Sequence, residues 1–367
     1  MQHLTVLGLM SGTSMDGLDC GLFDISLSPQ YKMEWSCVDF ITFPYRNNVR
    51  QSIINALCKG DKYISIANKI LGNEFARKSI KFLNGREIDL ISLHGQTVAH
   101  SDGESTLQVG NPEKLYEYLK VPVVFNIRQA DILVGGNGAP LMPFLDWLLF
   151  KEEDQDVITL NLGGVANVSF IPASGNRNKV LGFDTGPGMA LIDECCNKFY
   201  GQAIDMDALH AIKGNIDETI LNELMSHDFI KKNPPKSTGR NEFGVELLNS
   251  IIMKYPKVTT DDLIRTFCIF TAKSIAENVN KFLNFSSLNK RMIISGGGTH
   301  HPVLMQAIQK YCDIKDILTS DELGIQADQK EALLMAVLGV ARLQNMPANM
   351  PGVTGAKKKV ILGEIII

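Results

Sequence analysis

The stretch LGLMSGTSMDGLDCGLFDI, residues 7–25, begins in an apolar run, breaks into small and hydroxyl residues, and becomes apolar again. It predicts two β-strands, residues 4–9 and 18–25, joined by a glycine-containing turn. Glycines let backbone N–H groups converge on one point, and the Ser and Thr hydroxyls add donors, so the turn is a candidate anion-binding loop. A tight hairpin without a ligand explains the same residues equally well, because Asp-Gly is a common hairpin pair.

The strand–glycine–strand pattern recurs in the second half of the chain. LNLGGVANVSF at 160–170 repeats it, and SGGGTHHP at 295–302 follows a further strand at 290–294. Similar units in two halves predict an α/β protein of two related lobes that face one another across a cleft. We place the N-terminal lobe at residues 1–127 and the C-terminal lobe at 128–344, and we expect the tail, 345–367, to return to the first lobe.

Hydrophobic periodicity predicts the other elements. The expected strands are 31–43, 88–94, 121–127, 157–162 and 180–183. The expected helices are 63–82, 112–119, 217–224, 245–255, 261–282 and 329–343, and one more opens at Pro187 and Gly188.

Composition argues against several classes of protein. The 367 residues carry a net charge of -4 with a pI of about 6.0, so bulk charge does not indicate a nucleic acid or an anionic membrane as partner. The seven cysteines form no C-x-x-C motif and are odd in number, which fits the reduced thiols of a cytosolic protein. The N-terminus lacks the basic and apolar regions of a signal peptide, and no apolar run approaches the roughly 18 residues that cross a bilayer. We therefore expect a cytoplasmic protein.

Three glycine clusters are candidate nucleotide contacts. They comprise Gly12, Thr13, Ser14, Met15, Asp16 and Gly17 in the first cluster, Gly163 and Gly164 in the second, and Gly296, Gly297 and Gly298 in the third. The P-loop pattern G-x-x-x-x-G-K-[ST] is absent, but three such clusters after apolar strands favour phosphate binding over three unrelated turns. An aspartate beside an anion site repels phosphate unless a divalent cation lies between them. Asp16 is therefore a candidate partner of Mg²⁺ or of a Mg²⁺-bound water.

The motif GFDTGPG places Asp184 at the end of an apolar strand, just before an expected helix. The helix dipole and nearby backbone amides would hold this carboxylate ionised. A positioned, ionised carboxylate is a candidate general base. The alternative is that Asp184 or Thr185 only caps the helix.

Other polar motifs give weaker indications. In SLHGQTVAH, contact of His94 and Gln96 with a polar substrate is a better interpretation than zinc binding, because the histidine spacing fits no standard ligand pair. In PPKSTGR, Lys236 and Arg240 face either the cleft or the solvent. The motifs G-x-S-x-G and H-E-x-x-H are absent, which argues against a serine hydrolase of that type and a zincin.

Nine motifs, taken in order, resemble those of the anhydro-N-acetylmuramic acid kinase family. They are GLMSGTSMDGLD, SLHGQTVAH, LQVGNP, GGNGAPL, NLGGVANVSF, GFDTGPG, PPKSTGR, SGGGTHHP and QADQKEALLMAVLG. The resemblance implies the sugar kinase, heat-shock-protein-70 and actin fold, with two ribonuclease-H-like lobes and a nucleotide cleft between them. It also implies a reaction. ATP phosphorylates the 6-oxygen of 1,6-anhydro-N-acetylmuramic acid while water opens the anhydro bridge, giving N-acetylmuramic acid 6-phosphate and ADP in cytoplasmic cell-wall recycling.

The resemblance also assigns roles by position. Asp184 corresponds to the catalytic aspartate, which would deprotonate the water that attacks the anomeric carbon. Residues 12–17 correspond to the phosphate loop, with Asp16 near Mg²⁺, and the glycines at 163–164 and 296–298 would line the nucleotide. The residues implied to face the sugar are His94, Gln96, Arg128 and Glu331. A homodimer is implied as well.

The chain departs from the family pattern at two places. Asn126 begins Asn-Ile-Arg where the family usually has Asp-Phe-Arg, and Met189 stands where it usually has Asn. The first change removes a carboxylate near the implied sugar site, and the second removes a polar side chain beside the base. A second hypothesis is therefore phosphorylation of another amino sugar without ring hydrolysis. A third, an ATP-gated binding protein, is disfavoured because no room follows the second lobe for a peptide-binding domain.

Overall fold

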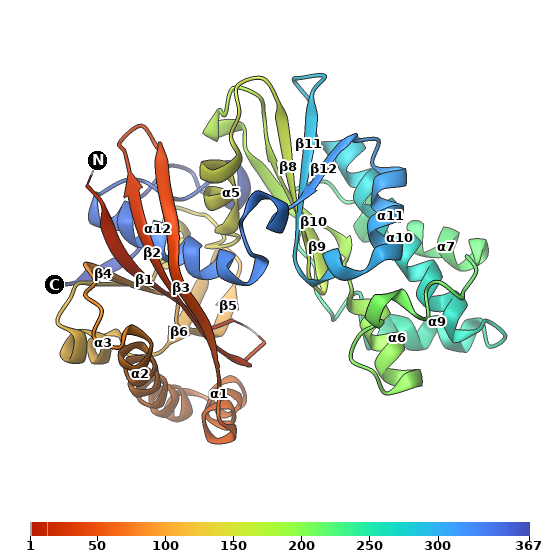
Figure 1. Cartoon of the computed structure of the whole chain (residues 1–367). Coiled ribbons are helices and arrows are strands. Elements are labelled where there is room, and N and C mark those ends of the chain that lie inside the picture. Colours follow the sequence, from red (N-terminus) through yellow and green to blue (C-terminus); the bar gives the residue numbers. More distant parts are fainter. Residues whose placement is uncertain (1, 13) are drawn as a thin grey trace. The chain divides into compact units, whose positions relative to one another are not determined.

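The computed structural model describes residues 2–12 and 14–367 and divides into two compact units (Figure 1). The first unit is Met1–Leu149 with Asp328–Ile367, and the second is Phe150–Ala327. The predicted α/β class and the organisation in two units are confirmed. The unit boundaries differ from the expected 127/128 and 344/345, because the segment 128–149 and the helix after residue 329 belong to the first unit.

The first unit is built on a six-stranded sheet in the order β13-β7-β4-β1-β2-β3. Its strands are β1 Leu4–Met10, β2 Gly17–Leu27, β3 Met33–Pro44, β4 Leu90–Leu93, β7 Val123–Phe125 and β13 Glu364–Ile366. The three N-terminal strands are antiparallel, whereas β1, β4 and β7 run parallel. Strand β13 pairs antiparallel with β7, so the C-terminal segment completes the N-terminal sheet.

Helices cover both faces of this sheet (Figure 1). The helices of the first unit are α1 Asn47–Lys59, α2 Asp61–Leu83, α3 Pro112–Leu119, α4 Gln129–Ile132, α5 Met142–Phe150, α12 Lys330–Leu343 and α13 Pro351–Thr354, of which α12 packs on one face of the sheet and α1, α2 and α3 lie on the other. Successive strand residues point to opposite faces. Leu7 and Leu9 therefore pack into one core with residues of α1 and α2, while Gly8 faces α12. A Cβ at Gly8 would collide with the backbone of Ala332, so glycine is needed for the helix to lie this close.

A two-stranded hairpin, β5 Gln96–Ser101 and β6 Ser105–Val109, also belongs to the first unit. Neither the hairpin nor α1 was predicted. Both are amphipathic and half-exposed, so their apolar residues form no long run.

The second unit repeats the same strand order. Its five-stranded sheet is β10-β9-β8-β11-β12, made of β8 Asp156–Leu162, β9 Val165–Ile171, β10 Leu181–Pro187, β11 Lys290–Ser295 and β12 Asp316–Thr319. Strands β8, β9 and β10 are antiparallel, and β8, β11 and β12 are parallel. This is the arrangement of β1, β2, β3, β4 and β7, so both units have the implied ribonuclease-H-like topology.

One long, largely buried helix, α10 Thr260–Phe282, runs through the core of the second unit. The helices of this unit are α6 Ala190–Tyr200, α7 Glu218–Met225, α8 Asp228–Lys231, α9 Val245–Lys254, α10 Thr260–Phe282 and α11 Pro302–Tyr311. Short 3-10 turns lie at Arg177–Lys179, Met206–Ala208, Gly297–His300, Asp321–Leu323 and Ala327–Gln329. Phe267, Phe270 and Ile275 of α10 are fully buried and hold the sheet and the smaller helices together.

At the GFDTGPG motif, the predicted boundary between strand and helix was wrong. The helix expected to open at Pro187 and Gly188 begins at Ala190, and the strand expected to end at 183 continues to Pro187. Pro187 still pairs with Val165 of β9, so the chain stays extended. Asp184 therefore lies inside a strand rather than at a helix N-terminus.

Candidate active site

The first glycine loop, residues 11–16, connects β1 to β2. The Met15 amide donates to the Gly12 carbonyl, with 3.2 Å between N and O, and the Ser14 hydroxyl donates to the Asp16 carboxylate at 2.8 Å. Thr13, a predicted phosphate contact, lies outside the described residues. The Asp16 side chain is exposed and oriented by Ser14, which suits a carboxylate that meets a ligand from solvent.

The predicted nucleotide glycines fall into two groups by the space around them. A Cβ at Gly17, Gly296 or Gly298 would lie 2.6 to 2.7 Å from atoms of Phe43 or Leu162, so protein packing requires glycine there. A Cβ would meet nothing closer than 3.5 Å at Gly12, Gly163 and Gly164, and nothing within 4 Å at Gly297. At these four positions packing does not require glycine, which leaves the backbone open to a ligand.

Carboxylates gather beside the first loop within the first unit. Burial raises the pKa of Asp19, and the negative charges of Asp16 and Asp328 raise it further, against a hydrogen bond from Thr42. Burial likewise raises the pKa of Glu331, together with the charges of Asp19 and Asp16. The side chain of Glu331 is solvent-accessible, so this burial is partial. The converging negative potential favours a cation at this place.

These carboxylates suit a Mg²⁺ ion that is coordinated partly by the protein and partly by a bound ligand. Within residues 2–12 and 14–367, no three His, Cys, Asp or Glu side chains form a cluster able to hold a metal. Mg²⁺ commonly keeps several waters and binds one or two carboxylates together with substrate phosphates, so a complete protein cage is not expected.

His94 and Arg128, two predicted sugar contacts, form a bonded pair. Arg128 Nε donates to His94 Nε2 at 2.8 Å, and His94 Nδ1 lies 2.9 Å from the Gly95 carbonyl. Nδ1 must therefore carry the proton, which makes the ring neutral. Burial and the Arg128 charge lower the pKa of His94 to about 3, in agreement. Arg128 also donates to the Gly138 carbonyl; burial lowers the pKa of its guanidinium, and the negative charge of Glu331 offsets only part of this.

Gln96 is placed differently from the other predicted sugar contacts. Its side chain is only 1% exposed, and its Oε1 accepts a hydrogen bond from the Ser11 hydroxyl at 2.8 Å. Ser11 is the first residue of the first loop, directly after β1. The structure thus joins Gln96 to the loop and buries it.

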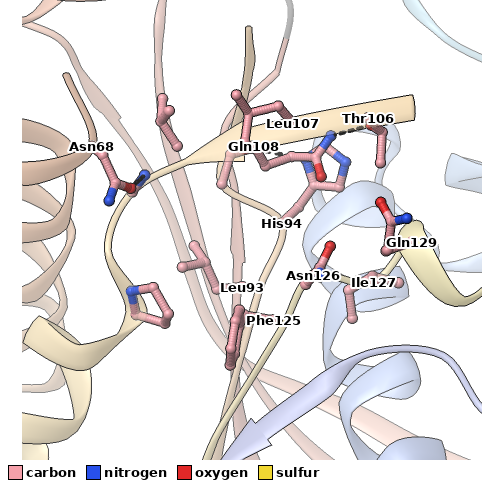
Figure 2. Close-up of a pocket in the computed structure, with 14 residues that line it drawn as sticks. Asn68, Leu93, His94, Thr106, Leu107, Gln108, Phe125, Asn126, Ile127 and Gln129 are labelled. Carbon is pink, nitrogen blue, oxygen red and sulfur yellow. Dashed lines mark hydrogen bonds between the residues drawn. The ribbon is translucent and has the colours of Figure 1, made fainter. Parts of the chain in front are cut away.

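A pocket of about 340 Å³ opens beside His94 in the first unit (Figure 2). Amide and hydroxyl side chains of Asn68, Thr106, Gln108, Asn126 and Gln129 line it together with apolar residues. The lining that the structure describes includes no Asp, Glu, Lys or Arg, and His94 is neutral. Such a surface suits uncharged hydroxyl and amide groups.

Asn126, one of the two departures from the family pattern, is bonded at the end of β7. Its Nδ2 donates to the Glu364 carboxylate of β13 at 2.6 Å, and its φ is +51°. Asn tolerates this left-handed conformation. An aspartate here would face Glu364, so the amide matches the C-terminal strand of this chain.

In the second unit the motif GFDTGPG folds against the Gly163–Gly164 turn. The amides of Gly188 and Ala190 donate to the Gly164 carbonyl, and that of Met189 donates to the Gly163 carbonyl. These two carbonyls therefore accept from the first amide of α6 and from the two amides before it, and no side chain caps the helix. Met189, the second departure, is 9% exposed and packs in the core. Two predicted site motifs are thus in direct contact.

A bulge in β10 sets the direction of Asp184. Thr185 is skipped in the ladder with β9, and its hydroxyl donates to the Ala166 carbonyl at 3.1 Å. Its carbonyl accepts from Ser274 and Asn278 of α10. Gly186 has φ +142°, and a Cβ there would lie 2.6 Å from Ser274 Oγ. Both features require glycine after the bulge.

Backbone groups of the PPKSTGR motif, residues 234–240, also hold Asp184. The Asp184 amide donates to the Lys236 carbonyl at 3.1 Å, and the Thr238 amide donates to the Asp184 carboxylate at 2.8 Å. A backbone amide that donates to a carboxylate favours its ionised form. Sequence reasoning missed Thr238, because a backbone donor leaves no signature in residue type.

The structure separates the two basic residues of this motif. Lys236 is buried, its Nζ donates to the carbonyls of Phe229 and Ile230, and burial lowers its pKa to about 8. Arg240 is exposed, pairs with Glu194 at 2.8 Å, and has its guanidinium over Gly164. Arg240 is thus the basic side chain of the motif that lies at a predicted nucleotide glycine.

Comparison with known proteins gives matches over nearly the whole chain. The family model described as Anhydro-N-acetylmuramic acid kinase matches residues 4–367. A curated protein of that name from Clostridioides difficile (strain 630) is 36% identical over 374 residues, covering 98% of this chain and 97% of the relative. One from Francisella tularensis subsp. novicida (strain U112) is 35% identical over 376 residues, with the same coverage.

Solved structures are more distant. The activator of the 2-hydroxyisocaproyl-CoA dehydratase from Clostridium difficile with bound ADPNP has a TM-score of 0.46 at 10% identity, over 93% of this chain and 96% of that one. The ROK hexokinase from Thermus thermophilus has a TM-score of 0.39 at 13% identity, over 92% and 100%. Similarity at this level carries no information on substrate.

Proposed function

This chain belongs to the anhydro-N-acetylmuramic acid kinase family, and we propose that it carries out the reaction of that family. ATP, 1,6-anhydro-N-acetylmuramic acid and water give N-acetylmuramic acid 6-phosphate and ADP. Phosphorylation at O6 is coupled to opening of the anhydro ring, as a step in cell-wall recycling. The observation that carries the proposal is the position of Asp184, held by the bulge in β10 and by the Thr238 amide.

Asp184 is the proposed general base. A half-buried carboxylate that accepts a backbone amide at 2.8 Å is oriented and can take a proton from water. The water, once deprotonated, attacks the anomeric carbon and breaks its bond to the bridging oxygen. That oxygen stays on C6 and attacks the γ-phosphorus of ATP, whose bond to the β–γ bridging oxygen breaks.

The glycine clusters are the proposed nucleotide contacts. The open positions Gly12, Gly163, Gly164 and Gly297 leave room for close approach by phosphate and nucleoside groups. Arg240 over Gly164 adds a positive charge at one of these places. Asp16, among neighbouring carboxylates, is the proposed partner of Mg²⁺, which neutralises phosphate charge when bound.

Arg128, Glu331 and the pocket beside His94 are the proposed sugar contacts in the first unit. The neutral His94 ring holds Arg128 by accepting from its Nε, which leaves the guanidinium charge for an anionic group. The uncharged pocket lining suits hydroxyl and N-acetyl groups. The predicted homodimer and cytoplasmic location stay predictions. Among the described residues, no helix is both long and apolar enough to cross a membrane.

Isotope labelling tests the reaction. The protein is incubated with ATP, Mg²⁺ and anhydro-N-acetylmuramic acid in ¹⁸O-water, and the product is analysed by mass spectrometry. We expect one ¹⁸O at the anomeric hydroxyl and none in the phosphate. N-acetylmuramic acid 6-phosphate kept in the same water controls for slow exchange. A phosphorylated product that retains the anhydro ring would refute coupled hydrolysis.

A second candidate is phosphorylation of another amino sugar without hydrolysis. Two observations favour it: Met189 buries an apolar side chain beside the motif of the base, and Asn126 lines the pocket without a charge. A substrate panel with an ADP readout separates the candidates, because the second predicts faster turnover of a reducing amino sugar than of the anhydro sugar.

A further inference from the structure

Tyr45 contacts both ends of the first glycine loop. Its amide donates to the Asp16 carbonyl at 2.8 Å, and its hydroxyl lies 2.7 Å from Ser11 Oγ. The side chain is 6% exposed, so it does not reach the solvent at the loop. A single residue therefore bridges the two positions at which the loop leaves the sheet.

The hydrogen-bond direction of this bridge is fixed by Gln96. Gln96 Oε1 has no hydrogen, so the Ser11 hydroxyl must donate to it. Ser11 has a single hydroxyl hydrogen, and the Tyr45 hydroxyl must therefore donate to Ser11 Oγ. The chain Tyr45 to Ser11 to Gln96 is directional, and its three members come from three separate segments of the first unit: the connection after β3, the first glycine loop and β5.

Lys78 of α2 holds Tyr45 in place. Its Nζ lies 4.5 Å from the centre of the Tyr45 ring and donates to the carbonyls of Phe43 and Pro44, just before Tyr45. Lys78 is buried and pairs with Glu74 at 3.3 Å. The bridge is thus anchored on the longest helix of the first unit.

We propose that Tyr45 and Gln96 are positioning residues of the first loop, acting through Ser11, so that both serve the nucleotide and neither contacts the sugar. The proposal rests on the proposed function, in which this loop binds the phosphates of ATP. It assigns Gln96 to a different ligand from the one that its sequence motif implies. Its side-chain oxygen is taken by Ser11, and its side chain is buried.

Calorimetric titration with Mg²⁺-ATP, without sugar, tests the proposal on Tyr45→Phe, Ser11→Ala and Gln96→Met. Each variant removes one member of the hydrogen-bonded chain with little change in shape. We expect the ATP dissociation constant to rise about 3- to 10-fold in Tyr45→Phe and in Gln96→Met, the effect of one lost hydrogen bond, and at least as much in Ser11→Ala, which loses two. The KM for the sugar in Gln96→Met should stay within about twofold of the wild type.

Tyr31→Phe is the matched control. The Tyr31 hydroxyl also donates one partly buried hydrogen bond, to the Pro347 carbonyl at 2.9 Å, in the same unit. It should lower the melting temperature about as much as Tyr45→Phe does, without a change in ATP affinity. The double variant Tyr45→Phe with Ser11→Ala should bind ATP no more weakly than Ser11→Ala alone, because the Tyr45 hydroxyl acts through Ser11.

Two results overturn the proposal. One is a Tyr45→Phe variant that loses stability as Tyr31→Phe does but binds ATP as the wild type does. The other is a Gln96→Met variant whose sugar KM rises while its ATP affinity is unchanged. A wild-type protein that turns over the sugar but binds no ATP would instead refute the proposed function, and with it this role of the loop.

Discussion

Two backbone contacts fix Asp184, one on its own amide and one on its carboxylate, and both come from the segment 236–238. Replacing Asp184 by Asn keeps an oxygen that can accept the Thr238 amide but removes the basic site. We expect kcat to fall by about 10²–10⁴-fold, the usual contribution of a general base, with an unchanged melting temperature. Steady-state kinetics and thermal unfolding of the variant check this. Near-normal turnover would remove Asp184 from the role of base.

Asp193, on α6, gives a pH-dependent prediction. Burial raises its pKa to about 6, the Arg240 charge and the His301 ring lower it, and Glu194 raises it. Its Oδ1 is buried without a hydrogen-bond partner in the part of the chain that the structure describes. The folded protein therefore holds this proton up to a higher pH than the unfolded chain does. Its stability should fall as pH rises from about 4 through 6.

Asp193→Asn should remove this dependence. Because the side chain is partly exposed, we expect a gain of only about 1–2 kcal/mol in the free energy of unfolding at pH 8, and no gain at pH 4. Urea unfolding at both pH values measures it, with the exposed Asp313→Asn as a control in the same unit. An equal effect of Asp193→Asn at the two pH values would contradict the predicted linkage.

At the scale of elements, some glycines are needed for folding and others for ligand binding, and substitution by alanine tells the two apart. Gly186→Ala places a Cβ beside Ser274 at a φ of +142°, so we expect a loss of about 1–3 kcal/mol of stability. Gly297→Ala meets no atom within 4 Å and should leave the melting temperature unchanged. It should nevertheless raise the ATP dissociation constant at least about threefold, because the methyl group occupies the approach to the backbone. Thermal unfolding and ATP titration of both variants decide this. A Gly297→Ala variant with wild-type ATP affinity would show that this glycine does not contact the nucleotide.

The sequence predicts elements where a repeating apolar pattern runs their full length. The predicted helix 112–119 coincides with α3, and 261–282 begins one residue after α10 does. The bulge at Thr185 could not be predicted, because it depends on α10 donors that lie some 90 residues away in the chain. Tyr45 and Thr238 were missed for a related reason. Their roles come from tertiary contacts, and their residue types are unremarkable in any strand or loop.

At the scale of the whole molecule, the chain repeats one strand order and places a glycine turn at the same point of each repeat, between β1 and β2 and between β8 and β9. The two sheets have separate cores, and only the first takes in the C-terminal segment. Removal of β13 should therefore destabilise the first unit and leave the second unit unchanged.

Removal of residues 364–367 tests this independence. Strand β7 would lose its partner on one side, Asn126 would lose Glu364, and the half-buried Ile365 and Ile366 would be gone. We expect a loss of about 2–4 kcal/mol, from apolar burial and several hydrogen bonds. Hydrogen exchange should show faster exchange of the amides of β7 and β4, with β8 and β11 unchanged. Removal of Ile367 alone, which is 78% exposed, is the control and should change neither. If the two units unfold independently, their separate cores confine the change to the sheet that β13 completes. Equal loss of protection from exchange in both sheets would therefore mean that the two units unfold together.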